Sequence, residues 1–294
     1  MVQDATPNIT SSYVLHGLGG IGKTQIAIEY AYRHQKEFDI ICWLRADDYN
    51  TLISSYIQLA NNPTFKSFAN LNFNDKPNHK AIAKRVQMWF ENTLETRWLL
   101  VLDNADSLGS YGHLSPTRSK VKIRAFKALG TLIPKGNGGC VLVTSRSRSA
   151  VGEVAESGWE VRSMTEHDAK DLLIKCSKSK HLFDAMALVG TLGRHPLAIE
   201  QAGGFIRANG ISIAKYRSLF ESHKSKALKE GLSFTHQSVY YKHTIASTWE
   251  MSFQAIDEID PLASKLLRLI AFLDGKFIQK ELFTKGLSVL QKGL

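Results

Sequence analysis

Eight consecutive residues near the amino terminus have the types and spacing that bind phosphate groups: Gly17-Leu18-Gly19-Gly20-Ile21-Gly22-Lys23-Thr24. They match the pattern G-x-x-x-x-G-K-[ST], in which glycines let backbone N–H groups turn toward a phosphate. A helix begins where such a loop ends, and the positive end of its dipole faces the same phosphates. The Lys23 ammonium group can reach the β- and γ-phosphates, and the Thr24 hydroxyl can bind Mg²⁺. We therefore predict that these residues, together with Gln25, bind a nucleotide.

An aspartate, Asp103, follows the most apolar run of the chain, Trp98–Leu102. Ligands of parallel sheets bind beyond the carboxyl ends of the strands, so Asp103 is expected to hold Mg²⁺ together with Thr24. A turn or helix-capping role is the alternative for this aspartate. The next residue, Asn104, can orient a water molecule but cannot accept its proton. We therefore expect slow hydrolysis, or a switch that keeps its nucleotide bound.

An arginine, Arg146, follows another apolar run, Cys140–Val143. An arginine at the end of this run is expected to meet the γ-phosphate, where it stabilises charge on the transferred group and senses whether that group is present. The alternative is a solvated side chain in the basic segment Arg146-Ser147-Arg148. The expected catalytic residues are Lys23, Asp103 and Arg146.

Short apolar runs alternate with helical patterns through the first half of the chain. The apolar runs cover residues 13–15, 40–44, 98–102, 140–143 and 159–161, and the helical patterns lie at about 23–35, 51–60 and 79–93. Runs that stay apolar on both faces are typical of a parallel sheet covered by helices on two sides. The alternation predicts an α/β fold with a doubly wound parallel sheet.

The second half of the chain has mostly helical patterns. Thr165 and Asp168 resemble a capping box at the start of the first of these helices. The polar stretch Lys224–Gln237 is typical of a linker. Boundaries near residues 163 and 238 then divide the chain into three predicted domains: 1–163, 164–237 and 238–294.

Composition restricts the class of partner. The formal net charge of +10 favours anionic partners but does not choose among nucleotides, nucleic acids and acidic membranes. No run approaches the length of a membrane span, and no secretory leader opens the chain. Three scattered cysteines are too few for a disulfide framework or a Cys-rich zinc site, so a reducing compartment is expected.

Six motifs follow one another along the chain: HGLGGIGKTQIA, WLLVLDNAD, GCVLVTSR, GRHPLAI, TWEMSF and LLRLIAFL. This ordered set resembles the NB-ARC domain of the STAND class of P-loop signalling ATPases, in the form of the NLR-like receptors of fungi, over about residues 12–285. The resemblance makes Gly17–Thr24 the Walker A motif, Asp103 the Walker B aspartate and Arg146 the sensor arginine. It implies a P-loop sheet domain, an all-α helical subdomain and a partial winged-helix domain, in that order.

The fourth motif implies one more nucleotide contact. Residues 194–198 correspond to the Gly-Leu-Pro-Leu-Ala motif of the family, whose proline packs near the adenine, so Pro196 joins the candidate nucleotide-binding residues. Only the Pro-Leu-Ala part is kept, because Arg194 replaces the glycine and His195 replaces the first leucine. Pro196 also opens a predicted helix, where proline is favourable in any protein.

The resemblance implies a switch that binds ADP or ATP with Mg²⁺ and whose nucleotide state controls opening and oligomerisation. It further implies innate-immune signal transduction in the cytoplasm, through self-association or protein partners and without nucleic acid. The family's Gly-Arg element before the first strand and its Met-His-Asp-type motif have no counterpart here, nor do its effector domain and sensor repeats. The chain is therefore expected to be the central switch with both ends removed.

Two other functions stay open. A metabolic phosphoryl-transfer enzyme would use the same loop, but it needs an acceptor-binding lid and a base, and neither is evident in the sequence. A winged-helix DNA-binding regulator would explain the positive net charge. The late helices have apolar stripes and few arginines, which argues against DNA binding.

Overall fold

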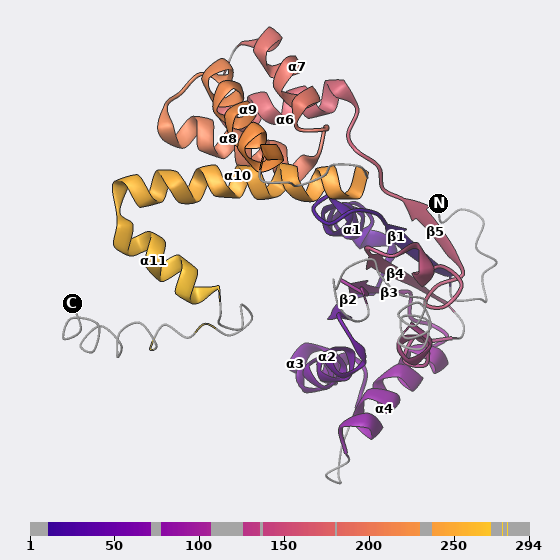
Figure 1. Ribbon diagram of the computed structural model, residues 1–294. Coiled ribbons are helices and arrows are strands. Elements are labelled where there is room, and N and C mark those ends of the chain that lie inside the picture. The colour runs from indigo at the N-terminus through magenta and orange to yellow at the C-terminus, as the bar shows by residue number, and fades with distance from the viewer. Residues whose placement is uncertain are drawn as a thin grey trace. The chain divides into compact units, whose positions relative to one another are not determined.

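The computed structural model describes residues 11–71, 78–106, 126–135, 138–179, 181–229, 237–271, 278 and 281. The chain divides into two compact units, Met1–Ser163 and Met164–Leu294. The first unit holds the sheet and the second is helical (Figure 1).

The sheet of the first unit has five strands, all parallel, in the order β2-β3-β4-β1-β5. The five strands are β1 (Ser11–His16), β2 (Ile40–Arg45), β3 (Trp98–Asp103), β4 (Gly139–Ser145) and β5 (Ser157–Glu160). Each forms at one of the apolar runs that the sequence singled out. The predicted α/β fold with a parallel sheet is therefore confirmed.

Helices cover both faces of this sheet, with α1 on one face and α2, α3 and α4 on the other (Figure 1). The helices and 3₁₀ turns of this unit whose bounds the structure describes are α1 (Lys23–Arg33), η1 (Gln35–Glu37), α2 (Tyr49–Asn61), α3 (Pro63–Phe68), α4 (His79–Asn92) and η2 (Arg148–Ala150). The side chains of Asp48, Asn62 and Asn78 cap α2, α3 and α4, each accepting a hydrogen bond from a backbone N–H of the first turn. The short helix α3 was not predicted from the sequence.

Strand β3 is apolar from Trp98 to Leu102 because both of its faces are covered there. Leu99 and Val101 pack in the layer under α1, whereas Trp98, Leu100 and Leu102 pack in the core formed with α2 and α4. All five side chains are buried. Burying each of them contributes roughly 1.5–3 kcal/mol, so this strand anchors both layers of the unit.

Strand β4 lies between β1 and β3, although it follows both in the sequence. His16 at the end of β1 pairs with Ser145, and Leu102 pairs with Val143. The carboxyl ends of the three strands therefore lie side by side. This order places the segments that follow β1, β3 and β4 at one edge of the sheet.

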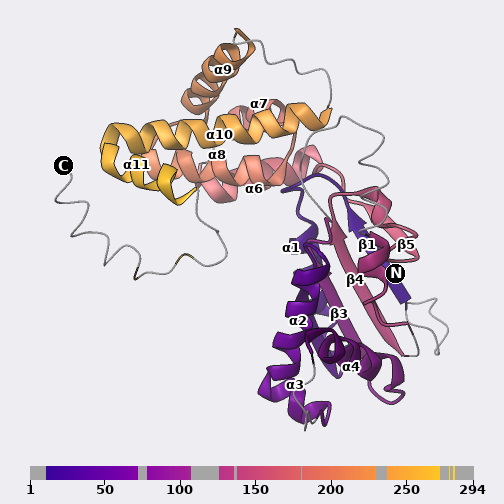
Figure 2. The same ribbon diagram turned by 60° about the horizontal axis from the view of Figure 1, so that its bottom comes forward.

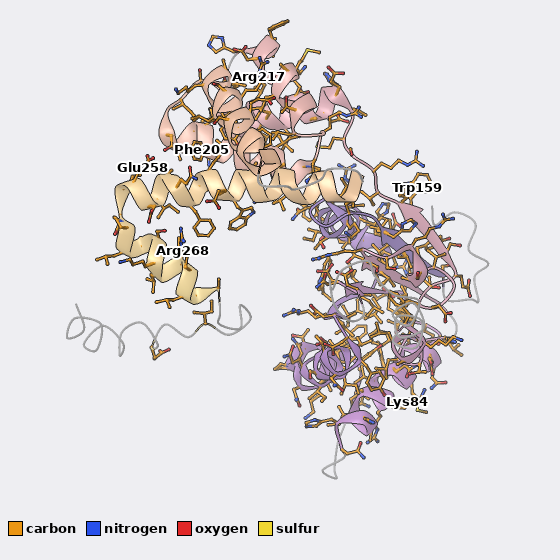
Figure 3. All side chains as sticks on the ribbon, in the orientation of Figure 1. Lys84, Trp159, Phe205, Arg217, Glu258 and Arg268 are labelled. Atoms are coloured by element: carbon orange, nitrogen blue, oxygen red, sulfur yellow. The ribbon has the colours of Figure 1, made fainter. Side chains whose placement is uncertain are left out.

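The second unit is a helical bundle around a separate core. Its helices among the described residues include α6 (Glu166–Ser177), α7 (Leu182–Thr191), α8 (Pro196–Asn209), α9 (Ile213–Lys229), α10 (Gln237–Ile259) and α11 (Pro261–Ile270). Helix α10 lies along α8 (Figure 2). Phe205 of α8, labelled in Figure 3, packs edge-on against Tyr216 of α9 with ring centroids 5.5 Å apart.

Two local predictions for this unit have different outcomes. Thr165 caps α6 as predicted, because its Oγ1 accepts a hydrogen bond from the Asp168 N–H at 3.1 Å. The predicted linker Lys224–Gln237 is wrong in its first part, because α9 continues to Lys229. The Lys, Ala and Leu residues in the first part of this stretch have high helix propensity, although the stretch as a whole is polar. Most of the chain after α11 lies outside the described residues, and the predicted winged-helix domain stays a prediction.

All three cysteines, Cys42, Cys140 and Cys176, are free thiols. Burial raises the pKa of Cys42 to about 12 and the pKa of Cys140 to about 11. These two thiols are therefore unreactive near neutral pH. Among the helices that the structure describes, none combines the length and the apolar character needed to cross a lipid bilayer.

Two glycines provide a matched test of the packing. A Cβ on Gly139 would overlap the indole ring of Trp98, whereas a Cβ on Gly204 would meet nothing within 4 Å. We expect Gly139→Ala to lower the free energy of unfolding by about 1–3 kcal/mol through overpacking. Gly204→Ala, inside α8, should raise it by about 0.5–1 kcal/mol. Urea unfolding curves of both variants test this, and a stable Gly139→Ala variant would contradict the described packing.

Candidate nucleotide-binding site

The predicted phosphate loop joins the end of β1 to the start of α1. Gly17, Gly20 and Gly22 have φ values of 149°, 74° and 102°, which lie in the region that favours glycine. A Cβ on Gly17 would also lie 2.5 Å from the carbonyl oxygen of Val161. Gly22 is the N-cap of α1 and provides no side-chain cap. The first N–H groups of this helix can therefore bind an anion.

Lys23, the first residue of α1, is nearly buried, with 9% of its surface exposed. Its Nζ donates hydrogen bonds to the carbonyl oxygens of Gly17 at 2.9 Å and Leu18 at 2.8 Å. Burial lowers the pKa of this lysine, Asp106 and Asp103 act to raise it, and Arg146 acts to lower it. The ammonium group therefore lies against the loop, within the electrostatic reach of two carboxylates and a second cation.

Asp103 accepts two hydrogen bonds on the same carboxylate oxygen. Its Oδ1 accepts from the hydroxyl of Thr24 at 2.8 Å and from the hydroxyl of Thr144 at 2.6 Å. The structure thus brings together the two residues that the sequence proposed for Mg²⁺. A carboxylate and a hydroxyl oxygen are the hard donors that Mg²⁺ prefers, alongside water and phosphate oxygens, so these residues fit the ion.

Thr144 and Ser145 at the end of β4 were not predicted as site residues. Thr144 is 1% exposed, donates to Asp103, and accepts a hydrogen bond from the Asn104 N–H at 2.8 Å. Ser145 donates to the carbonyl oxygen of Ala105 at 2.7 Å. Hydroxyl residues that end an apolar run were the available signal in the sequence. Their hydrogen bonds fasten the end of β4 to the segment after β3.

Asn104 adopts a left-handed backbone conformation, with φ at 67°, which asparagine tolerates better than most residues. Its side-chain amide donates to Asp47 Oδ1 at 2.8 Å. Asp47 follows β2 and also lies 3.1 Å from the Arg45 guanidinium group. The polar groups after β2 and β3 are therefore linked, and Asp47 is a further residue that sequence reasoning missed.

Arg146 lies beside the phosphate loop. A Cβ on Gly19 would lie 3.5 Å from Arg146 Nε. Asp106 binds this arginine twice: its Oδ1 accepts from the backbone N–H at 2.6 Å, and its Oδ2 lies 2.9 Å from Nε. Asp106, three residues after Asp103, is therefore also a site residue that sequence reasoning missed. The predicted sensor role of Arg146 stays a prediction.

The remaining candidates lie outside this group of contacts. Gln25 is exposed on the first turn of α1. Pro196 belongs to the second unit, where it is the first residue of α8. Two residues before it, at the position where the family motif has glycine, Arg194 has φ at 56°, in the left-handed region that favours glycine. The proposed contact of Pro196 with adenine stays a prediction.

Comparison with known proteins finds one curated relative with a similar sequence. It is a nucleotide-binding leucine-rich repeat (NLR)-like protein of Hyaloscypha variabilis, 33% identical over 269 residues. The match covers 87% of this chain and 26% of the relative, so the chain spans about a quarter of the length of that protein. No protein-family profile matches the chain.

Solved structures show partial likeness in fold. A STAND protein with a tetratricopeptide repeat sensor from Pyrococcus horikoshii matches with 19% identity and a TM-score of 0.36, over 65% of this chain and 27% of that chain. The Walker-type ATPase of Pyrococcus abyssi matches with 13% identity and a TM-score of 0.46, over 75% of this chain and 69% of that one.

The hydroxyl of Thr144 is expected to hold this edge of the sheet together. Thr144→Val keeps the shape but leaves the Asn104 N–H without this acceptor, so we expect a loss of about 1–3 kcal/mol in unfolding free energy. Thr131→Val is the control, because it removes an exposed hydroxyl that donates to the Ala128 carbonyl at 2.6 Å, and should cost less than about 0.5 kcal/mol. Equal losses in the two urea curves would contradict the described role of Thr144.

Proposed function

We propose that this chain, a relative of the NLR-like proteins as its motifs predict, binds ADP and ATP with Mg²⁺ and serves as a signalling switch. The observation that carries the proposal is the meeting of the phosphate loop with Asp103 through the Thr24 hydroxyl, at 2.8 Å. A glycine-rich turn at a random surface site has no reason to meet a carboxylate that ends a different strand.

The loop and Lys23 are proposed to bind the phosphates. The loop provides backbone N–H groups and the open end of α1, both of which attract negative charge. Lys23 exchanges its two carbonyl partners for phosphate oxygens, which are stronger acceptors because they are charged. Burial excludes water from this contact and strengthens it.

Thr24 and Asp103 would hold Mg²⁺, and Thr144 positions the carboxylate. The ion supplies positive charge that neutralises the phosphates. The second hydroxyl on Asp103 Oδ1 comes from a different strand. Thr144 is therefore a positioning residue, because it acts on the carboxylate and not on the nucleotide.

Hydrolysis is proposed to be slow. Asn104 stands where many related enzymes have an acid, and its amide donates to Asp47. An amide cannot accept the proton of an attacking water, and a general base contributes about 10²–10⁴-fold to such a rate. Arg146 beside Gly19 is proposed to distinguish ATP from ADP by binding the γ-phosphate.

The nucleotide state is proposed to shift the protein between a closed form and an open, oligomerising form. The free energy available for this shift equals the difference in affinity of the two forms for each nucleotide. Innate-immune signalling in the cytoplasm through protein partners is the setting that the resemblance favours. Pro196 is proposed to pack near the adenine, and nucleic acid is not an expected partner.

Purified protein should carry bound ADP. We expect Lys23→Ala to weaken ADP binding by about 10- to 100-fold, because it removes a charge-assisted contact. Lys66→Ala, on the exposed surface of α3, is the matched control and should bind like the unaltered chain. Chromatography of the released nucleotide and calorimetry with Mg²⁺ measure both effects. ATP turnover at metabolic-enzyme rates would instead favour a phosphoryl-transfer enzyme.

Nucleotide affinity should fall at alkaline pH. Burial lowers the pKa of Lys23, and only the protonated ammonium group attracts phosphate. Affinity for ADP should therefore be highest below this lowered pKa and decrease as the pH rises through it. The second ionisation of a phosphate group is complete by roughly pH 7, so the ligand adds no further change. Calorimetry from about pH 7 to 10 tests this, with Lys23→Arg as a control that stays charged.

A further inference from the structure

The side chain of Asp106 holds Arg146 through two different groups. One carboxylate oxygen accepts from the Arg146 backbone N–H at 2.6 Å, and the other lies 2.9 Å from the guanidinium Nε. The backbone contact fixes the carboxylate at the start of the segment after β4. The side-chain contact then pairs the Arg146 guanidinium group with the Asp106 carboxylate.

The same carboxylate acts on the other cation of the site. Among the charged groups that act on Lys23, Asp106 is the strongest, ahead of Arg146 and Asp103. Lys23 and Arg146 are the cations proposed to bind a nucleotide's phosphates, and Asp106 lies near both. Asp106 makes its direct contacts with Arg146, so its negative charge acts most strongly on a phosphate that approaches that arginine.

We propose that Asp106 sets the preference of the chain between nucleoside diphosphate and triphosphate, by competing with the γ-phosphate for Arg146. This inference rests on the proposed function, because it requires that the loop binds a nucleotide. A diphosphate ends at the loop and Lys23. Only the terminal phosphate of a triphosphate reaches toward Arg146, so only the triphosphate has to displace Asp106 and approach its charge.

The two contacts of Asp106 with Arg146 can be separated by a substitution, because only the contact with the guanidinium group depends on the negative charge of Asp106. Asparagine keeps an oxygen that accepts the Arg146 backbone N–H, but it carries no charge to pair with the guanidinium group. Asp106→Asn therefore preserves the local backbone contact and removes the competitor. An exposed ion pair of this kind is weak, because 55% of the Arg146 side chain is exposed, and the expected effect is correspondingly moderate.

The experiment measures affinities for Mg²⁺–ADP and for a Mg²⁺-bound non-hydrolysable ATP analogue by calorimetry. We expect Asp106→Asn to tighten the binding of the analogue by about three- to tenfold and to change ADP affinity by less than about twofold. Glu29→Gln is the matched control. It also removes one acid from an exposed pair of this unit, with Arg33 at 2.6 Å, but on the outside of α1. Its ratio of the two affinities should not change.

A double-variant cycle separates competition from a general charge effect. In an Arg146→Gln background, Asp106→Asn should tighten analogue binding by less than it does in the unaltered chain. Analogue affinity that stays the same or falls in Asp106→Asn would overturn the proposal and make Asp106 a group that positions Arg146. If the unaltered chain binds neither nucleotide, the proposed function itself fails. Binding of ADP with an unchanged preference overturns only the role of Asp106.

Discussion

One carboxylate oxygen, Asp103 Oδ1, joins three elements of the first unit. It accepts the hydroxyl of Thr24 from α1 and the hydroxyl of Thr144 from β4, while its own residue ends β3. Thr144 is buried, so the carboxylate has lost water on that side and depends on this partner. The phosphate loop, the proposed metal position and the segment that carries Arg146 all depend on this shared atom for their relative positions.

Acidic side chains hold the polar groups at the rest of this edge. Asp47 accepts the amide of Asn104, and Asp106 binds Arg146 through its backbone and its side chain. The two aspartates follow β2 and β3, which are neighbours in the sheet. At this edge, the carboxylates of Asp47 and Asp106 therefore lie close to the guanidinium groups of Arg45 and Arg146. The protein's overall positive charge says little about this edge, because the nearest charged groups dominate the local electrostatic potential.

The sequence was sufficient to predict the features that depend on residues close together along the chain. Five apolar runs became five strands, and the spacing of glycines with Lys23 and Thr24 identified the loop. Thr144, Asp47 and Asp106 were missed because their partners depend on strand order. Only the insertion of β4 between β1 and β3 makes Thr144 a neighbour of Asp103. The helix α9 also extends into the stretch predicted as a linker, because helix propensity outweighed the polar character of that stretch.

The ammonium group of Lys23 already donates to two carbonyl oxygens, those of Gly17 and Leu18. An incoming anion gains only the difference between the new hydrogen bonds and these old ones. A lone inorganic phosphate would make few contacts to compensate for the loss of these two hydrogen bonds. A polyphosphate would also reach the loop amides and the end of α1. At the proposed site, these two carbonyl groups of the main chain would therefore disfavour small anions that contact Lys23 alone.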